Sequence, residues 1–262
     1  MSSFDQQGEA RSRLTLPHGD PVAAELILAI HSGDLDALRR LVGERPELAT
    51  ARMIGRKGVE GGWRTPLHAA ADWPGYFPNA PAAVAILLAS GADPNDDTGA
   101  ANPETPLHWA ASTDDVDVAV ELVDGGADLE RPGGSIGTPL DNAIGYGCWH
   151  VARLLVERGA KVDRLWHAAG LGMLARLEEL MADNPGHEEI SKAFWHACSA
   201  AERRAAEYLL AHGADLNWVP DYAEGTPLDV ANGSGTRRAN VITWLRELGA
   251  RSSAPNPPAT QP

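Results

Sequence analysis

The chain has 262 residues and a net charge of −14, from 36 acidic and 22 basic residues. This excess of acid repels phosphate backbones, so we expect no nucleic-acid partner. The sequence has no apolar run of about 18 residues, and its first residues lack the apolar centre of a secretory signal, so no membrane span is expected. Two cysteines are too few for a disulfide framework. These features predict a cytoplasmic protein.

Helical periodicity begins after a polar segment, residues 1–20, that we expect to be disordered. An apolar stripe over residues 26–30 is interrupted at Gly33 and resumes over residues 35–42. Pro46 then ends the second helix. This pattern predicts a pair of helices at the start of the ordered region.

The sequence Thr-Pro-Leu, followed by His or Asp, then occurs four times. Threonine before a helix accepts a backbone N–H of the first turn, and proline at the first helical position lacks an N–H that would be unpaired there. Each downstream segment ends in Gly-Ala, where glycine can adopt the left-handed turn that closes a helix. The copies begin at Thr65, Thr105, Thr138 and Thr226, and their Gly-Ala endings begin at Gly91, Gly126, Gly159 and Gly249. A fifth ending, at Gly213, closes a segment that lacks its own Thr-Pro-Leu.

These copies resemble the ankyrin repeat. The resemblance implies an all-α solenoid of about seven stacked helix pairs with short β-turn fingers, because each repeat buries its apolar face against its neighbours. It also implies that His68 and His108 form hydrogen bonds within the turn of their own or the adjacent repeat. Asp141 and Asp229 take the same position and can accept a similar local bond. The predominance of arginine among the basic residues suggests a bacterial source with a GC-rich genome.

Two repeats with a degenerate motif lie between the third and fourth copies. Trp166 and Trp195, each followed by histidine, stand where the other repeats have leucine, so both are expected to fill core volume. The close spacing of these repeats leaves little room for fingers. The ankyrin repeat domain is therefore expected over residues 21–251, followed by a proline-rich disordered tail over residues 252–262.

Departures from the repeat indicate where a partner binds. In the family the fifth motif position and the finger tips face the concave surface, and Trp109 holds that position. Residues 72–79 are inserted between the two helices of the second repeat, and residues 52–64 form a long glycine-rich finger. Long loops on a rigid scaffold often carry binding, and tryptophan is enriched in interface hot spots. The predicted partner-binding residues, which we expect to gather at one end of the array, are Trp63, Arg64, Trp73, Tyr76, Phe77 and Trp109.

Each of these features also has a structural interpretation. Trp109 can pack over a neighbouring turn, and the insertion at residues 72–79 can be a self-packed cover over an otherwise exposed core. The four bases of the finger can pair with an acidic partner segment or with neighbouring acids of the same chain. These bases are Arg52, Arg56, Lys57 and Arg64.

Catalysis and metal binding are not expected. Cysteine and histidine occur together at residues 148–150 and 196–198. However, equivalent positions on stacked helices stay about 8–10 Å apart, whereas zinc ligands lie about 2.0–2.3 Å from one point. No nucleophile-elbow, phosphate-loop or metalloprotease motif occurs. The acids of residues 114–117 open a helix, where negative charge suits the helix dipole. We therefore predict no catalytic residue, cofactor or metal site.

Two functions remain open at this point. The resemblance to ankyrin repeats favours a non-catalytic, monomeric module that binds a protein partner through its concave face and turn loops. The alternative is a regulatory pocket for a small molecule or peptide, lined by the aromatic residues of the 72–79 insertion. A docking surface predicts that Trp73, Tyr76 and Trp109 are exposed, whereas a pocket predicts that they enclose a concavity with polar groups.

Overall fold

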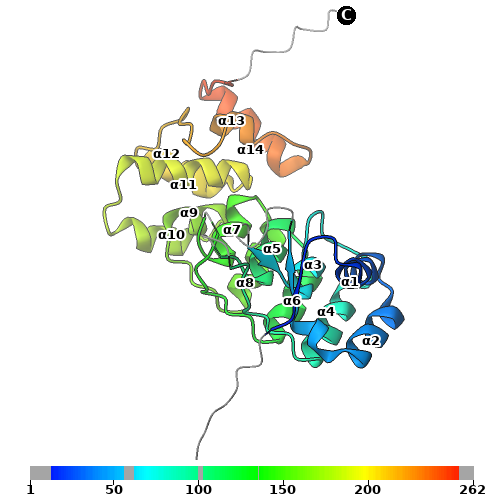
Figure 1. The fold of residues 1–262 in the computed structure, drawn as a ribbon. Coiled ribbons are helices and arrows are strands. Elements are labelled where there is room, and N and C mark those ends of the chain that lie inside the picture. Colours follow the sequence, from blue (N-terminus) through cyan, green and yellow to red (C-terminus); the bar gives the residue numbers. More distant parts are fainter. Residues whose placement is uncertain (1–12, 56–61, 100–102, 135, 254–262) are drawn as a thin grey trace, which may run out of the picture. The chain divides into compact units, whose positions relative to one another are not determined.

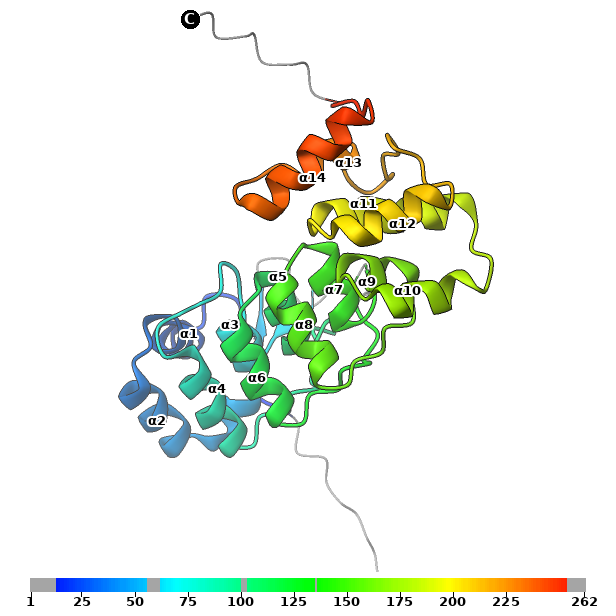
Figure 2. The same ribbon diagram turned by 180° about the vertical axis from the view of Figure 1, so that it is seen from behind.

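The structure is a computed structural model, and it describes residues 13–55, 62–99, 103–134 and 136–253. The chain divides into two compact units, Met1–Pro139 (unit 1) and Leu140–Pro262 (unit 2). Both units are built from paired helices (Figures 1 and 2). None of the helices in the described part of the chain is long and apolar enough to cross a membrane.

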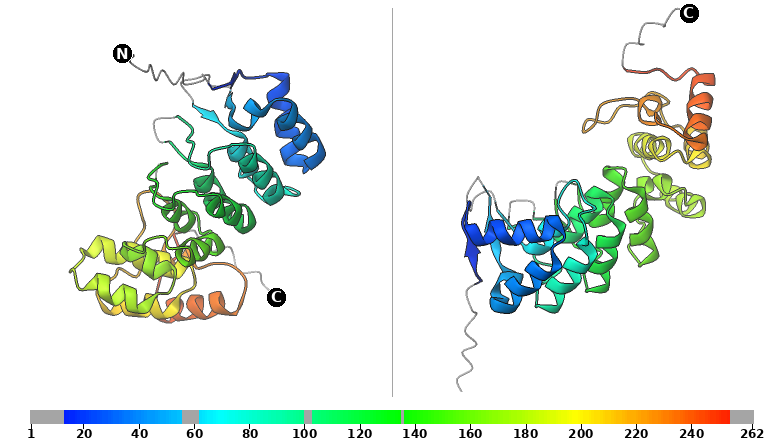
Figure 3. Two further views of the ribbon diagram at one scale, coloured as in Figure 1. Left: turned by 90° about the horizontal axis from the view of Figure 1, so that it is seen from below. Right: turned by 90° about the vertical axis from the view of Figure 1, so that its right-hand side faces the viewer.

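Unit 1 contains three helix pairs in two layers. The first helices of the pairs contact one another in order, and so do the second helices (Figure 3). The pairs are α1 (Pro21–Ser32) with α2 (Leu35–Glu44), α3 (Pro66–Ala70) with α4 (Ala80–Ala89), and α5 (Pro106–Thr113) with α6 (Val116–Asp124); a short 3-10 helix, η1 (Pro46–Thr50), follows α2.

A small sheet precedes the second pair. Its strands are β1 (Thr15–Leu16), β2 (Arg52–Ile54) and β3 (Trp63–Arg64), in the order β1-β2-β3. β2 pairs with β1 in parallel and with β3 antiparallel, so β2 and β3 are the two sides of a finger. β1 lies inside the segment for which the sequence predicts disorder, and it pairs with residues far along the chain.

The Thr-Pro-Leu-His motif forms the start of α3 and α5 as expected. In each case the threonine and the histidine three residues later cap the first turn reciprocally. The other ring nitrogen of each histidine reaches the next repeat: Nε2 of His68 lies 2.9 Å from the carbonyl oxygen of Glu104, and Nε2 of His108 lies 3.1 Å from that of Gly137. The expected local bonds of both histidines are confirmed, and each also joins two neighbouring repeats.

Unit 2 continues the paired arrangement. α9 packs against α11, and α11 packs against both α12 and α13. Its helices are α7 (Pro139–Gly145, beginning at the boundary), α8 (Trp149–Glu157), α9 (Leu165–Gly170), α10 (Leu174–Met181), α11 (His187–Ser199), α12 (Arg203–Ala211), α13 (Pro227–Val230) and α14 (Thr236–Glu247). The described residues thus form 14 α-helices. This number is compatible with seven pairs, although how many of them are intact repeats stays a prediction.

The two degenerate repeats bury their tryptophans. Trp166 is 5% exposed and Trp195 is 8% exposed, and Nε1 of Trp195 donates to the carbonyl oxygen of Gly225 at 3.0 Å. Both side chains therefore fill the position that leucine holds in the regular repeats. Of the aspartates in the histidine position, Asp229 acts locally, since it accepts a bond from the Thr226 N–H at 2.9 Å, whereas Asp141 lies 2.9 Å from Nε2 of His167 in the next repeat.

Candidate functional site

A groove of about 750 Å³ lies on unit 1 beside the finger. One wall is α1 with the turn that precedes it, and the other is the end of β2 with β3. Trp63 and Arg64 on β3 and Trp109 on α5 line it together. Three of the six predicted partner-binding residues therefore share one concave surface.

Trp63 is held from two sides. The guanidinium carbon of Arg52 lies 4.1 Å from the centroid of its ring, which is a cation–π contact. On the other side is Gly99, where an added Cβ would lie only 2.0 Å from the indole. The backbone N–H of Trp63 also donates to the carbonyl oxygen of Thr98 at 2.8 Å. The ring is therefore positioned by its own repeat and by the following finger.

Trp109 is half-buried and its orientation is fixed by a hydrogen bond. Its Nε1 atom donates to Oε2 of Glu104 at 3.0 Å, and its ring meets the ring of His68 edge-on at 5.0 Å between centroids. Burial lowers the pKa of His68 to about 4, outweighing its bond to the Glu104 carbonyl oxygen, so this imidazole is neutral at physiological pH. The Trp109 side chain therefore packs on the adjacent turn while it also lines the groove.

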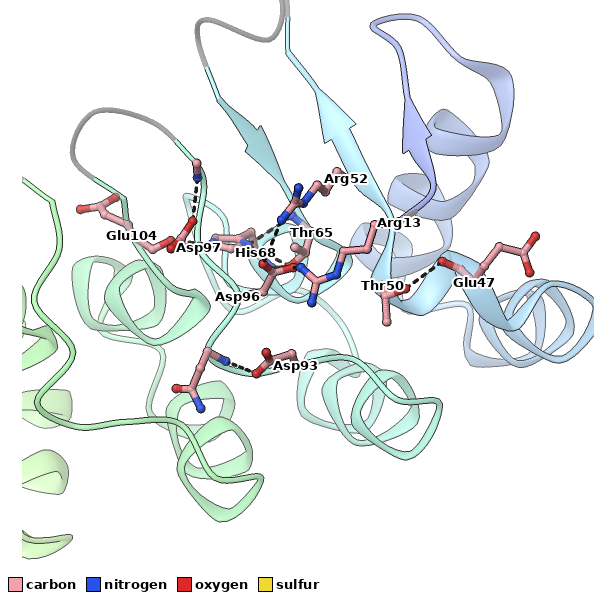
Figure 4. A network of polar contacts seen from close by, with 12 residues as sticks. Arg13, Glu47, Thr50, Arg52, Thr65, His68, Asp93, Asp96, Asp97 and Glu104 are labelled. Carbon is pink, nitrogen blue, oxygen red and sulfur yellow. Dashed lines mark hydrogen bonds and ion pairs between the residues drawn. The ribbon is translucent and has the colours of Figure 1, made fainter. Parts of the chain in front are cut away.

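The basic residues of the finger pair with acids of the same chain. Figure 4 shows Asp96 between Arg13, which donates to it, and Arg52, at 4.0 Å. Arg64 donates to Asp72 at 2.8 Å. These contacts favour the interpretation in which neighbouring acids neutralise the finger. The remaining bases of the finger, Arg56 and Lys57, lie outside the described residues.

The insertion between α3 and α4 contacts the turns of both neighbouring repeats. On one side, the Phe77 ring stacks on His31 with 4.1 Å between centroids, and Nδ2 of Asn79 donates to the carbonyl oxygen of Gly33 at 3.0 Å. On the other side, the Tyr76 N–H donates to the carboxylate of Asp115 at 2.6 Å. The insertion therefore links three consecutive repeats.

The aromatic residues of the insertion do not share the groove. Trp73 is 79% exposed and Tyr76 is 61% exposed, while Phe77 is half-buried, and none of them lines the groove. Of the six predicted residues, three thus line the groove and three lie on the insertion. This placement gives no support to a pocket lined by the insertion.

Gly33 should be essential for seating the insertion. Its φ is +70°, and an added Cβ would lie 2.3 Å from the carbonyl oxygen of Pro78. Gly33→Ala is therefore expected to lower the free energy of unfolding by about 3 kcal/mol, from left-handed strain and displacement of the insertion. Gly91→Ala is the matched control, because Gly91 has a φ of +93° and open space around its Cβ position. It should cost about 1 kcal/mol. Equal losses in urea denaturation would show that the insertion is not seated on Gly33.

Comparison with known proteins agrees with this architecture. Residues 76–164 match a family model described as ankyrin repeats, three copies. Residues 76–164 of the chain are therefore ankyrin repeats. A search of curated proteins found no match.

Two solved ankyrin repeat domains are similar to this chain. One is the ankyrin repeat domain of Bcl-3, described as a unique member of the IkappaB protein family, with 26% identity over 85% of this chain and 97% of that chain and a TM-score of 0.46. The other is the human ASB11 ankyrin repeat domain, with 27% identity over 72% of this chain and 85% of that chain and a TM-score of 0.42.

The groove on unit 1 also contains residues that the sequence alone did not single out. α1 contributes Ile27, and β2 contributes Met53 and Ile54. Ile27 is half-buried and lies beside the buried stripe of α1, not within it. An apolar residue at the edge of the stripe was a recognisable signal of an apolar surface outside the core. The contribution of β2 depends on how the finger folds back on itself, which the repeat motif does not specify.

Proposed function

We propose that the ankyrin repeats form a non-catalytic module that binds a partner protein in the groove of unit 1. Trp63 and Trp109 supply two large apolar surfaces in one concavity, and the observation that carries the proposal is this pairing. Their orientations are set by Arg52, Gly99 and Glu104, so little side-chain entropy is lost when a partner packs on them. Arg64 lies at the edge of the same groove and offers a charged contact.

The insertion provides a second contact in this proposal. Trp73 is the most exposed large apolar side chain described. It directly follows Asp72, which accepts a hydrogen bond from Arg64. Tyr76 is exposed as well, while Phe77 anchors the loop on His31. Tryptophan and tyrosine lose few rotatable bonds when they are covered, which favours their use in recognition.

Affinity capture from lysate of the source cell tests the groove. Trp63→Ala and Trp109→Ala should each reduce recovery of the partner at least about tenfold, because removal of a hot-spot tryptophan costs about 2 kcal/mol or more. Tyr146→Ala is the matched control, since Tyr146 is an aromatic residue of unit 2 that is 60% exposed. Trp73→Ala should give a smaller loss than either groove variant.

The folded state of each variant is checked by its thermal unfolding curve before capture. Recovery of the same proteins in equal amounts by wild type, Trp63→Ala and Trp109→Ala would refute binding in the groove. Recovery that is lost only in Trp73→Ala would instead place the docking surface on the insertion. A monomeric state and a cytoplasmic location stay predictions from the sequence.

A further inference from the structure

A second concavity lies on unit 2, away from its fingers. It is a cleft of about 370 Å³ at the turns that join the two helices of successive repeats. Gly172 lines it from the α9–α10 turn, Glu202 from the α11–α12 turn, and Asn240 from the first half of α14. Three consecutive repeats therefore contribute to it.

This cleft is basic, although the protein as a whole is acidic. Arg203, Arg204 and Arg237 line it together with a single carboxylate, that of Glu202. Its charged lining therefore carries two net positive charges, whereas the whole chain carries −14. Such a reversal of sign concentrates anions locally in an otherwise repulsive field.

Glu202 holds the position that an anion would take. Its carboxylate lies 2.7 Å from Arg237 and 3.3 Å from Arg153, so it forms ion pairs with two guanidinium groups. It reaches this position beside Gly172, where an added Cβ would lie 2.5 Å from Oε2 of Glu202. A carboxylate is thus accommodated against Arg237, one of the arginines that line the cleft.

The remaining arginines differ in how they are held. Arg203 bonds Glu207 at 2.8 Å and also Asn240, which fixes its side chain at the edge of the cleft. Arg204 is exposed and has no partner among the described residues. α12 also begins here, and its N-cap residue makes no side-chain cap bond, so the positive end of the helix dipole adds to the field. Arg204 and Arg237 are therefore the groups best placed to bind an incoming anion.

We propose that this cleft binds a phosphate monoester carried by a phosphorylated segment of a partner protein. A phosphate monoester carries about 1.5 to 2 negative charges at pH 7, which matches the net charge of the lining. Guanidinium groups bind phosphate oxygens through two parallel hydrogen bonds, and arginine clusters are a common means of recognising phosphorylated segments. The overall negative charge of the chain repels nucleic acids and anionic membranes. One small cleft can neutralise only a few of the many negative charges that these partners carry. This site is independent of the groove on unit 1.

Titration of the full chain, followed by NMR chemical shifts, tests the proposal. The probes are an alanine-rich peptide with one phosphoserine, the same peptide without phosphate, inorganic phosphate, and phosphatidylcholine vesicles with and without a phosphoinositide. We expect the phosphopeptide to bind at least about tenfold more tightly than its unphosphorylated form, with shifts at residues 201–205 and 237–240. Glu202→Gln should tighten phosphopeptide binding, because it removes the competing carboxylate.

The matched variants separate the cleft from general electrostatic attraction. Arg204→Gln combined with Arg237→Gln should weaken phosphopeptide binding at least about tenfold, whereas Arg246→Gln, an exposed arginine elsewhere on α14, should leave it unchanged. Equal binding of the two peptides, or equal losses in the double variant and the control, would overturn the proposal. Binding confined to inorganic phosphate or to phosphoinositide vesicles would overturn it as well.

Discussion

Replacement of His68 by alanine is expected to lower the free energy of unfolding of unit 1 by about 4 kcal/mol. The ring is fully buried, accepts a bond from the Thr65 N–H at 3.2 Å and bonds the Glu104 carbonyl oxygen at 2.9 Å. Alanine leaves a cavity and deprives a buried N–H and a buried carbonyl oxygen of their partner. The loss should appear in urea denaturation as a lower midpoint for unit 1.

His68→Asn separates the two roles of the histidine. An asparagine oxygen can accept the Thr65 N–H, as the Asp229 carboxylate accepts the Thr226 N–H, but the side chain is too short to reach Glu104. We expect this variant to lose about 2 kcal/mol, between wild type and His68→Ala. Equal losses for both variants would show that the cap contributes nothing measurable. A loss below about 1 kcal/mol for His68→Ala would contradict the structural role of this residue.

Acidification from pH 6.5 to pH 4 is expected to destabilise both units. Burial is the largest cause that lowers the pKa of His68 to about 4 and of His196 to about 3, from an ordinary value of 6.5. Below pH 6.5 the unfolded chain therefore binds protons that the folded chain does not, so the free energy of unfolding falls as pH falls through this window. The loss is about 3 kcal/mol for His68, and neither histidine contributes to pH dependence above this window.

Urea denaturation at several pH values between 7 and 4 measures this effect. His68→Asn should show a flatter dependence of stability on pH than wild type, because it removes one group that is protonated only after unfolding. The same slope in His68→Asn and wild type would contradict a neutral, buried His68.

Local sequence was sufficient to predict the repeats. Thr65, Pro66 and His68 specify a capped helix start through contacts within four residues, so their roles follow from the motif alone. Trp166 and Trp195 could be assigned to the core because the helical period places them in the leucine position. By contrast, the pairing of β1 with β2 joins residues 15 and 52, and no local pattern specifies such a contact.

The candidate site was predictable only in part, for the same reason. Trp63 and Trp109 were identified as large aromatic residues at positions that face the concave surface, and they do line one groove. Whether Phe77 is exposed depends on His31 in the preceding repeat, which the composition of the insertion does not reveal. The arginine cleft is formed by three repeats, and Arg204 and Arg237 are unremarkable in sequence until the turns that carry them are brought together.

The residues that line the groove run from the turn before α1 to α5. All of them therefore belong to the first three repeats. Ankyrin arrays lengthen and shorten by duplication or loss of whole repeats, and each repeat interacts chiefly with its immediate neighbours. A repeat gained or lost beyond α6 would therefore leave the groove unchanged, whereas one inserted between α1 and α5 would divide it. The proposed docking groove therefore does not depend on the length of the array beyond α6.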